Sequence, residues 1–300
     1  MFSKVIIATD LSKASNEVIK CAQGLIPLGA KEIILTECLK TLEATSLALA
    51  EDIESVDGIL EEQKSVLEKQ GFKVRTEKVF GTAHVEINRL IKEYNCDAVM
   101  VPSLGHSLLH EITLGSLAGD LIHHITKPLL LVRLKVENSK NEKENQCVLA
   151  SSCEDFHSSI LYATDFSEHA DKAFLYMEKL VKSGAKKVTL IHIQDMVSLA
   201  KASKELLKEY DNIDYKRLDE LKERLLKISD TKVNTKVVYG KPANEILKYA
   251  DEIKPALIVA GTHGRGFIGD LFVGSISHNI VRHANSSVLL IPKEETREDE

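Results

Sequence analysis

The chain repeats itself, and this duplication constrains its fold more than any other feature of the sequence. The segment Val5–Asp10 (VIIATD) closely matches Ile160–Asp165 (ILYATD), 155 positions further on. The Gly-Ser pairs at 115–116 and 274–275 are 159 positions apart. Two matches at nearly the same spacing predict two copies of one domain. The increase from 155 to 159 indicates a few extra residues inside the second copy.

Each copy alternates short apolar segments with longer amphipathic ones. In the second copy the predicted strands are 160–163, 188–193, 234–238, 256–260 and 288–291, and the predicted helices are 167–183, 197–229, 242–253 and 276–283. In the first copy the predicted strands are 5–9, 33–37, 74–79, 98–101 and 129–133. This alternation predicts an α/β fold of two tandem Rossmann-like domains, each a five-stranded parallel sheet with helices on both faces.

A polar stretch without periodicity joins the two copies. The segment 137–146 (ENSKNEKENQ) has no regular apolar spacing, which is typical of a linker. We therefore predict a first domain at 1–136, a linker at 137–157 and a second domain at 158–293. The five cysteines include no Cys-x-x-Cys pair, so their spacing indicates neither a disulfide framework nor a zinc site.

Composition narrows the classes of partner. The formal net charge of −6 argues against a broad basic face for nucleic acid and against electrostatic binding to a membrane. A hydrophobic share of 44% and a charged share of 28% are typical of a soluble globular protein. No apolar run reaches the roughly 18–20 residues that a membrane span needs, and the first residues lack the layout of a signal peptide. We expect a cytoplasmic protein.

The clearest motif lies where the fourth strand of the second copy meets the next helix. Gly261 and Gly264 follow the strand, and Gly274 and Ser275 stand at the start of the helix. Glycine lets another group approach the backbone closely, and a helix N-terminus offers unpaired N–H groups and the positive end of a dipole. Together they predict a seat for phosphate. The pattern Gly-x2-Gly-x9-Gly-(Ser/Thr) resembles the ATP-binding signature of the universal stress protein family.

The resemblance covers nearly the whole chain and implies a ligand. That ligand is an adenine nucleotide, ATP or AMP, with Mg²⁺ as an accompanying ion, bound by a protein of stress response. It would lie at the carboxyl ends of the second copy's strands, where open parallel sheets bind ligands. Strand one would meet the nucleoside, the backbone of strand two the adenine edge, and the glycine motif the ribose and phosphates. The implied binding residues are Ala163, Thr164, Asp165, Ile193, Ala260, Gly261, His263, Gly264, Arg265, Gly274, Ser275 and Ile276.

Three of these residues also have ordinary structural interpretations. Asp165 has the spacing of a residue that caps the following helix. Ser275 is equally suited to cap the helix after the motif, a role that is compatible with contact to a phosphate. Arg265 either pairs with phosphate or stays a solvated charge on a loop.

The first copy departs from the motif. Pro102 stands where the second copy has Gly261, and Glu37 stands where it has His192. Proline has no N–H to offer, and a glutamate adds negative charge close to where a phosphate ligand would lie. Our hypothesis is that the first copy binds nucleotide weakly or not at all.

Neither a catalytic set nor a metal site is expected. His106 with His110, and His123 with His124, are closely spaced, but no nearby cysteine supports a metal. No nucleophile, base and orienting group stand together in the sequence. The expected function is a nucleotide-binding sensor or signalling module rather than an enzyme. The alternatives are a slow ATP hydrolase or nucleotidyl-transferring enzyme, and a structural adaptor that binds no nucleotide.

The resemblance also implies how the two copies pair. Single-domain members of the family pair through their last strands, and the apolar segments 129–133 and 288–291 are the counterparts here. A linker of about 20 residues reaches between two domains easily. We predict an intramolecular pseudo-dimer, which leaves open a further homodimer of two chains.

Overall fold

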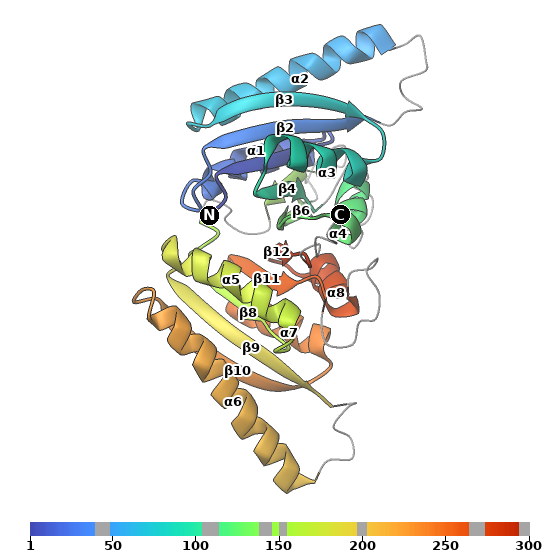
Figure 1. The fold of residues 1–300 in the computed structure, drawn as a ribbon. Helices are drawn as coiled ribbons and strands as arrows, with labels where there is room; N and C mark the ends of the chain where they lie inside the picture. The colour runs from blue at the N-terminus through green and yellow to red at the C-terminus, as the bar shows by residue number, and fades with distance from the viewer. Residues whose placement is uncertain are drawn as a thin grey trace, which may run out of the picture. The chain divides into compact units, whose positions relative to one another are not determined.

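A computed structural model of the chain describes residues 1–39, 49–103, 114–137, 146–149, 155–196, 203–263 and 274–293. The chain divides into two compact units, Met1–Glu154 (unit 1) and Asp155–Lys293 (unit 2), and Figure 1 labels most of their elements. Each unit holds a parallel sheet and helices. Within the described ranges, none of the helices is both long and apolar enough to cross a membrane.

Unit 1 is built around a sheet of five parallel strands in the order β3-β2-β1-β4-β5. This order places β1 at the centre, where its residues are almost all buried. The elements are β1 (Lys4–Thr9), α1 (Lys13–Cys21), the 3₁₀ helix η1 (Ala22–Leu25), β2 (Glu32–Leu39), α2 (Leu49–Lys69), β3 (Lys73–Phe80), α3 (Ala83–Tyr94), β4 (Ala98–Pro102), α4 (Ser116–His124), β5 (Leu129–Val132), β6 (Leu134–Glu137) and β7 (Gln146–Leu149).

Unit 2 repeats this plan with the strand order β10-β9-β8-β11-β12, again all parallel. The predicted α/β fold, with a five-stranded parallel sheet in each copy, is thereby confirmed. The elements are β8 (Ile160–Ala163), α5 (Glu168–Lys182), β9 (Lys187–Asp195), α6 (Lys204–Leu226), β10 (Lys232–Gly240), α7 (Pro242–Ile253), β11 (Leu257–Gly261), α8 (Ser275–His283) and β12 (Ser287–Ile291).

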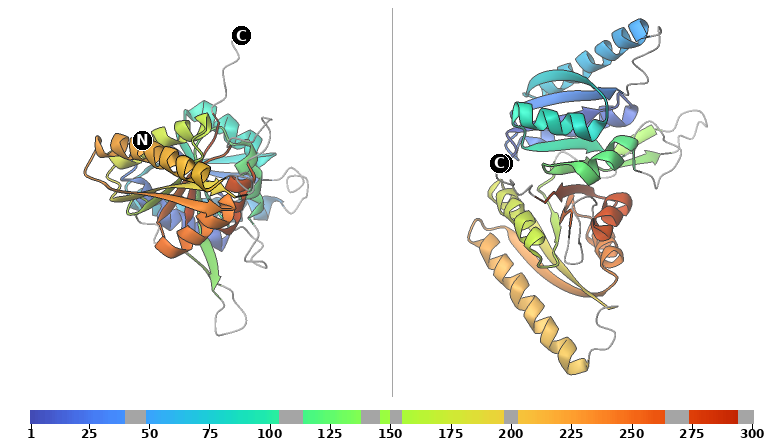
Figure 2. Two further views of the ribbon diagram at one scale, coloured as in Figure 1. Left: turned by 90° about the horizontal axis from the view of Figure 1, so that it is seen from below. Right: turned by 45° about the vertical axis from the view of Figure 1, so that its right-hand side comes forward.

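Helices cover both faces of the unit 2 sheet. Helices α5 and α6 contact each other on one face, and α7 and α8 contact each other on the opposite face (Figure 2). The central strands are therefore buried on both sides, which explains why they read as continuous apolar runs. Tyr162, Phe156 and Phe174 are the largest fully buried side chains described in unit 2.

The duplication extends to the bounds of the helices. Helices α3 and α7 have 12 residues each, α4 and α8 have nine each, and both pairs are offset by 159 positions. Residues 159 positions apart in these helices therefore occupy the same place in the two units. This equivalence provides matched positions for comparing the two units.

The predicted linker at 137–157 is not irregular throughout, because residue 137 and residues 146–149 belong to two short strands. Strands β6 and β7 pair in an antiparallel ladder that runs from Leu134 opposite Leu149 to Glu137 opposite Gln146. A four-residue strand has only two positions on each face, so its alternation is too short to stand out beside a polar run. The residues between these strands, 138–145, lie outside the described part of the chain.

Helix α6 is shorter than the 197–229 that the periodicity predicts. It begins after Ser203, whose side chain accepts a hydrogen bond from the backbone N–H of Leu206, and it ends at Leu226. A serine in this role satisfies an N–H group that has no partner within the helix, which fixes the start. The predicted residues 197–202 lie outside the described part of the chain.

The spacing of the cysteines does not predict the disulfide of Cys21. Cys21, at the end of α1, forms a disulfide, although the spacing of the cysteines indicates no disulfide framework. Helix α1 packs against β7, so the fold brings residues far apart in the sequence close together. Local spacing cannot reveal such a pairing. Cys38 and Cys96 are free thiols.

The thiols of Cys38 and Cys96 are expected to react slowly with alkylating reagents. Burial first, and then the carboxylates of Glu86, Glu37 and Asp120, raise the pKa of the Cys38 thiol to about 12, and burial raises the pKa of Cys96 to about 11. The reactive species is the thiolate, so at pH 8 both should react more than about tenfold slower in the folded chain than in urea. Mass-spectrometric counting of iodoacetamide adducts measures both rates. Equal rates in the two states would contradict this prediction.

Candidate functional site

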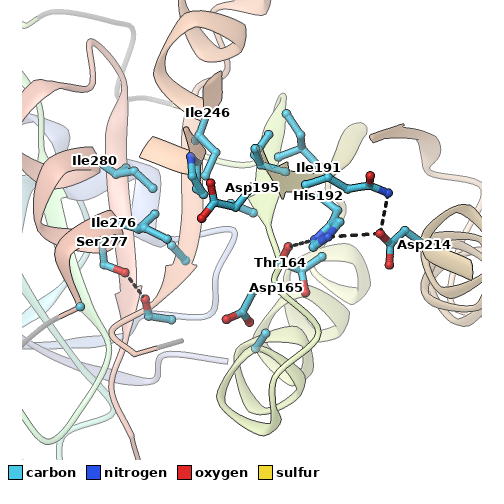
Figure 3. Close-up of a pocket in the computed structure, with 18 of the residues that line it drawn as sticks. Thr164, Asp165, Ile191, His192, Asp195, Asp214, Ile246, Ile276, Ser277 and Ile280 are labelled. Atoms are coloured by element: carbon cyan, nitrogen blue, oxygen red, sulfur yellow. Dashed lines mark hydrogen bonds and ion pairs between the residues drawn. The ribbon is translucent and has the colours of Figure 1, made fainter. Parts of the chain in front are cut away.

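A cavity of about 770 Å³ opens in unit 2 at the carboxyl ends of β8, β9 and β11. Open parallel sheets bind ligands at this end of their strands. Figure 3 shows side chains from these strands and from α6, α7 and α8 around it. Gly264 and Arg265 of the predicted set lie outside the described residues. The other ten predicted residues all line the cavity: Ala163, Thr164, Asp165, Ile193, Ala260, Gly261, His263, Gly274, Ser275 and Ile276.

A tight turn at the end of β8 places Asp165 at the cavity. The Thr164 hydroxyl accepts a hydrogen bond from the N–H of Phe166 (3.1 Å), and Asp165 Oδ1 accepts one from the N–H of Ser167 (3.0 Å). Phe166 has a left-handed backbone with φ of 57°. The interpretation of Asp165 as the helix cap is wrong, because Ser167 caps α5 through a bond from Ala170 N–H (3.2 Å).

The backbone of Ile193 faces the cavity because β8 is shorter than β9. On the side of β9 that faces β8, the carbonyl of Ile191 still has a partner, because it accepts a hydrogen bond from the N–H of Thr164 (3.0 Å). Residues two apart in a strand point their backbone groups to the same side. Strand β8 ends at Ala163, so the N–H and carbonyl of Ile193 point past its end towards the cavity.

A buried polar network closes the cavity on the side of α6. The ring of His192 donates from Nδ1 to the Thr164 carbonyl (2.8 Å), and its Nε2 lies 3.5 Å from Oδ2 of Asp214 (Figure 3). Gln194 Nε2 donates to the same Asp214 oxygen at 2.9 Å. All three residues are buried, with at most 9% of their surface exposed. The network fixes the position of the His192 ring next to the turn that carries Asp165.

An arginine from α6 extends this network to the mouth of the cavity. Arg217 lies 3.7 Å from Asp214 Oδ1, and its guanidinium carbon is 5.3 Å from the centre of the Phe166 ring. The Phe166 ring in turn packs against His192, with centroids 4.5 Å apart. The side chain of Arg217 is about half exposed, so its charge is available to an anionic group at the opening.

The opposite wall is formed by the first turn of α8. Gly274 precedes the helix and makes no side-chain cap, so the interpretation of Ser275 as the N-cap is wrong: Ser275 is the first helical residue and is exposed. The N–H groups of the first turn have no partner within the helix. Ser277 Oγ donates to the Gly261 carbonyl (2.7 Å), which joins this turn to the end of β11.

Apolar side chains complete the cavity between these polar walls. Ile191 comes from β9, Ile246 from α7, and Ile276 and Ile280 from α8 (Figure 3). Asp195, at the end of β9, lies at the edge of this group. A flat aromatic group fits an apolar slot whose ends carry a few polar groups.

Several lining residues were missed by sequence reasoning. His192 stands at the predicted end of the second strand but received no binding role, and Gln194 was not considered. The two alternate along β9, and this period of two would have placed both on the side of α6. Asp214 and Arg217 gave no signal, because α6 is rich in charged residues on most of its surface and its register against the sheet is set only by folding. Residues contributed by α6 and α7 were therefore absent from the predicted set.

Unit 1 arranges its equivalent residues differently. Asp10 Oδ1 accepts hydrogen bonds from the hydroxyls of Ser12 (2.5 Å) and Ser15 (2.6 Å) as well as from Ser12 N–H (3.1 Å). Unit 2 has Ala170 at the position of Ser15 and so lacks one of these hydroxyls. Pro102 is the last residue of β4 and is buried. Residues 104–113 of the first copy's motif stretch lie outside the described part of the chain.

Comparison with known proteins identifies the family. The sequence profile of the universal stress protein family matches residues 1–133 and 157–292, and the chain belongs to this family. A universal stress protein of Methanocaldococcus jannaschii is 26% identical over 155 residues, which cover 46% of this chain and 96% of that protein. A second one from the same organism is 30% identical over 148 residues, which cover 47% and 85%. The resemblance stated from the motif is confirmed.

A solved structure agrees in fold over both units. The crystal structure of a universal stress protein from Archaeoglobus fulgidus has a TM-score of 0.68 and 22% identity, and the match covers 97% of this chain and 99% of that one. At this level of identity the likeness concerns the fold alone. It confirms the α/β architecture of the two copies.

Proposed function

We propose that unit 2 binds an adenine nucleotide, ATP or AMP, and that the chain acts as a nucleotide-dependent module in stress response. The observation that carries the proposal is that one cavity receives both the open first turn of α8 and the open backbone of Ile193. Unpaired N–H groups at a helix N-terminus suit phosphate. An N–H and carbonyl side by side suit the donor and acceptor edge of adenine.

The cavity wall gives each part of the nucleotide a partner. The adenine ring lies among Ile191, Ile246 and the neighbouring isoleucines, with its edge against Ile193. Asp165 accepts hydrogen bonds from the nucleoside's hydroxyl or amino groups. The phosphates lie on the first turn of α8, and Mg²⁺ accompanies them as a counter-ion. The carboxylates of Asp165, Asp195 and Asp214 repel a negatively charged phosphate. The positive charge of Arg217 offsets part of this repulsion.

Calorimetric titration of the intact chain with ATP and with AMP tests the proposal. We expect one nucleotide per chain, because only unit 2 carries the complete set of motif glycines. Two sites per chain would show that Pro102 and Glu37 are compatible with binding in unit 1. An absence of binding to folded protein would refute the proposal and favour a structural adaptor.

We propose a binding module rather than an enzyme. The buried His192, Gln194 and Asp214 form hydrogen bonds with one another or with the backbone, an arrangement that suits positioning a ligand. Steady-state release of inorganic phosphate from ATP measures the alternative. A cytoplasmic location, pairing of the units through β5 and β12, and a further homodimer remain predictions from the sequence.

A further inference from the structure

A second group of ligand-type side chains lies in unit 1, between helices α3 and α4. His84 comes from the first turn of α3, and Asp120 and His124 come from α4. One nitrogen or oxygen atom of each residue lies within 4.8 Å of the others. His84 Nδ1 is 2.7 Å and His124 Nδ1 is 4.0 Å from Asp120 Oδ1. The two imidazole rings are stacked, with centroids 4.1 Å apart.

Hydrogen bonds fix the Asp120 carboxylate and the backbone at the end of α4 against α3. Asp120 Oδ2 accepts a hydrogen bond from the N–H of His84 (2.9 Å), which joins α4 to the start of α3. Asn88, one turn further along α3, donates to the carbonyl of His124 (2.7 Å) and accepts from the backbone and hydroxyl of Thr126. Both ends of the cluster are therefore tied to α3. A site fixed in this way loses little entropy when it takes up a ligand.

The electrical environment favours a cation. Asp120 acts together with the carboxylates of Glu86 and Glu37 on the partly buried Cys38 thiol, whose pKa they help to raise. This negative field lowers the free energy of a positive ion placed between Asp120 and the two histidines. The side chains of His84, Asp120 and His124 are 24%, 28% and 39% exposed, so an ion from solvent can reach them.

Unit 2 has the same two helices without this cluster. The residues 159 positions later are Ala243, Asn279 and His283. One histidine is kept, while the other histidine and the carboxylate are replaced by groups that bind metals poorly. The cluster is therefore a property of unit 1 and is not required for packing α3 against α4.

We propose that His84, Asp120 and His124 bind a divalent transition-metal ion, with Zn²⁺ the best match to two imidazoles and one carboxylate. Zinc holds such ligands at about 2.0–2.2 Å in a tetrahedron, which separates neighbouring ligand atoms by roughly 3.4 Å. The observed 2.7 and 4.0 Å lie on either side of this value. The His124 ring must turn so that its Nδ1 leaves the Asp120 carbonyl, 3.0 Å away, and faces the ion instead. A water molecule takes the fourth position.

Titration of the untagged, nucleotide-free chain with ZnCl₂, followed by calorimetry, tests the proposal. The double variant His84→Ala/Asp120→Asn gives unit 1 the residues that unit 2 already carries, so we expect it to fold. It should lose the site, with affinity lowered by more than about tenfold. The matched controls His283→Ala and His123→Ala should bind one ion per chain as the unaltered protein does.

Cobalt identifies the ligands independently of affinity. Co²⁺ bound by imidazole and carboxylate gives weak visible bands, whereas a thiolate ligand adds an intense near-ultraviolet band. We expect the weak bands alone, and we expect the double variant to lack them. Unchanged zinc binding in the double variant, an intense thiolate band, or no ion bound to the unaltered chain would each overturn the proposal.

Discussion

Replacing Gly274 by valine is expected to abolish nucleotide binding, with the affinity for ATP and AMP lowered by at least about 100-fold. A Cβ atom at this position would lie 3.3 Å from the Thr262 carbonyl oxygen, tighter than an ordinary contact. The N–H of Gly274 also donates to that oxygen at 2.7 Å, so the backbone cannot move away without losing the bond. The valine side chain would both shift and cover the first turn of α8. Losing two charge-assisted hydrogen bonds to phosphate, at about 1.5–3 kcal/mol each, accounts for the expected fold-change.

Gly115→Val is the matched control. Gly115 precedes α4 as Gly274 precedes α8, and its N–H donates to the Ser103 carbonyl at 3.0 Å. The steric disturbance is therefore similar, but it falls on unit 1. Calorimetry should give the same affinity and stoichiometry as for the unaltered chain, while circular dichroism checks that both variants are folded. Loss of binding in Gly115→Val and not in Gly274→Val would place the nucleotide in unit 1 and refute the assignment of the site.

The sequence alone predicts the backbone plan of each unit well, for physical reasons. Strands buried on both faces of a parallel sheet are continuous apolar runs, which stand out in the sequence. The helix at 242–253 is predicted to the residue, because Pro242 suits the first turn of a helix and the apolar spacing stops before Lys254. The duplication then supports the weaker signals of the first copy by analogy with the second.

The parts of the site near the motif could also be predicted, whereas those brought in by other helices could not. Gly261 and Gly274 lie in one stretch of chain, so their spacing carries the information. Asp214 comes within 3.5 Å of His192 only because α6 packs across β9 in one register. His84 contacts His124 because α3 packs on α4. The two histidines are far apart in the sequence, and no motif connects them. Packing registers of this kind depend on the whole core.

Phe174→Ala is expected to lower the free energy of unfolding of unit 2 by about 3–5 kcal/mol, the usual cost of removing a buried aromatic ring. Phe174 lies on α5, is fully buried, and packs with its ring centroid 5.6 Å from that of Tyr162. The guanidinium carbon of Arg224, from α6, lies 4.6 Å from the same ring centroid. One truncation therefore weakens the contact of α5 with both the sheet and α6. Leu175→Ala is the matched control, since this neighbour is 49% exposed and its loss should cost less than about 0.5 kcal/mol.

Urea titration followed by far-ultraviolet circular dichroism measures these changes, because the chain has no tryptophan to report by fluorescence. A cost below about 1 kcal/mol for Phe174→Ala would contradict the core assignment.

The same variant links the fold to the proposed function. A ligand that binds only the native state adds about 2.7 kcal/mol when its concentration is 100 times its Kd. Nucleotide should therefore restore much of the stability lost in Phe174→Ala. The double variant Phe174→Ala/Gly274→Val should gain no stability from nucleotide, because the valine at position 274 prevents the nucleotide from binding.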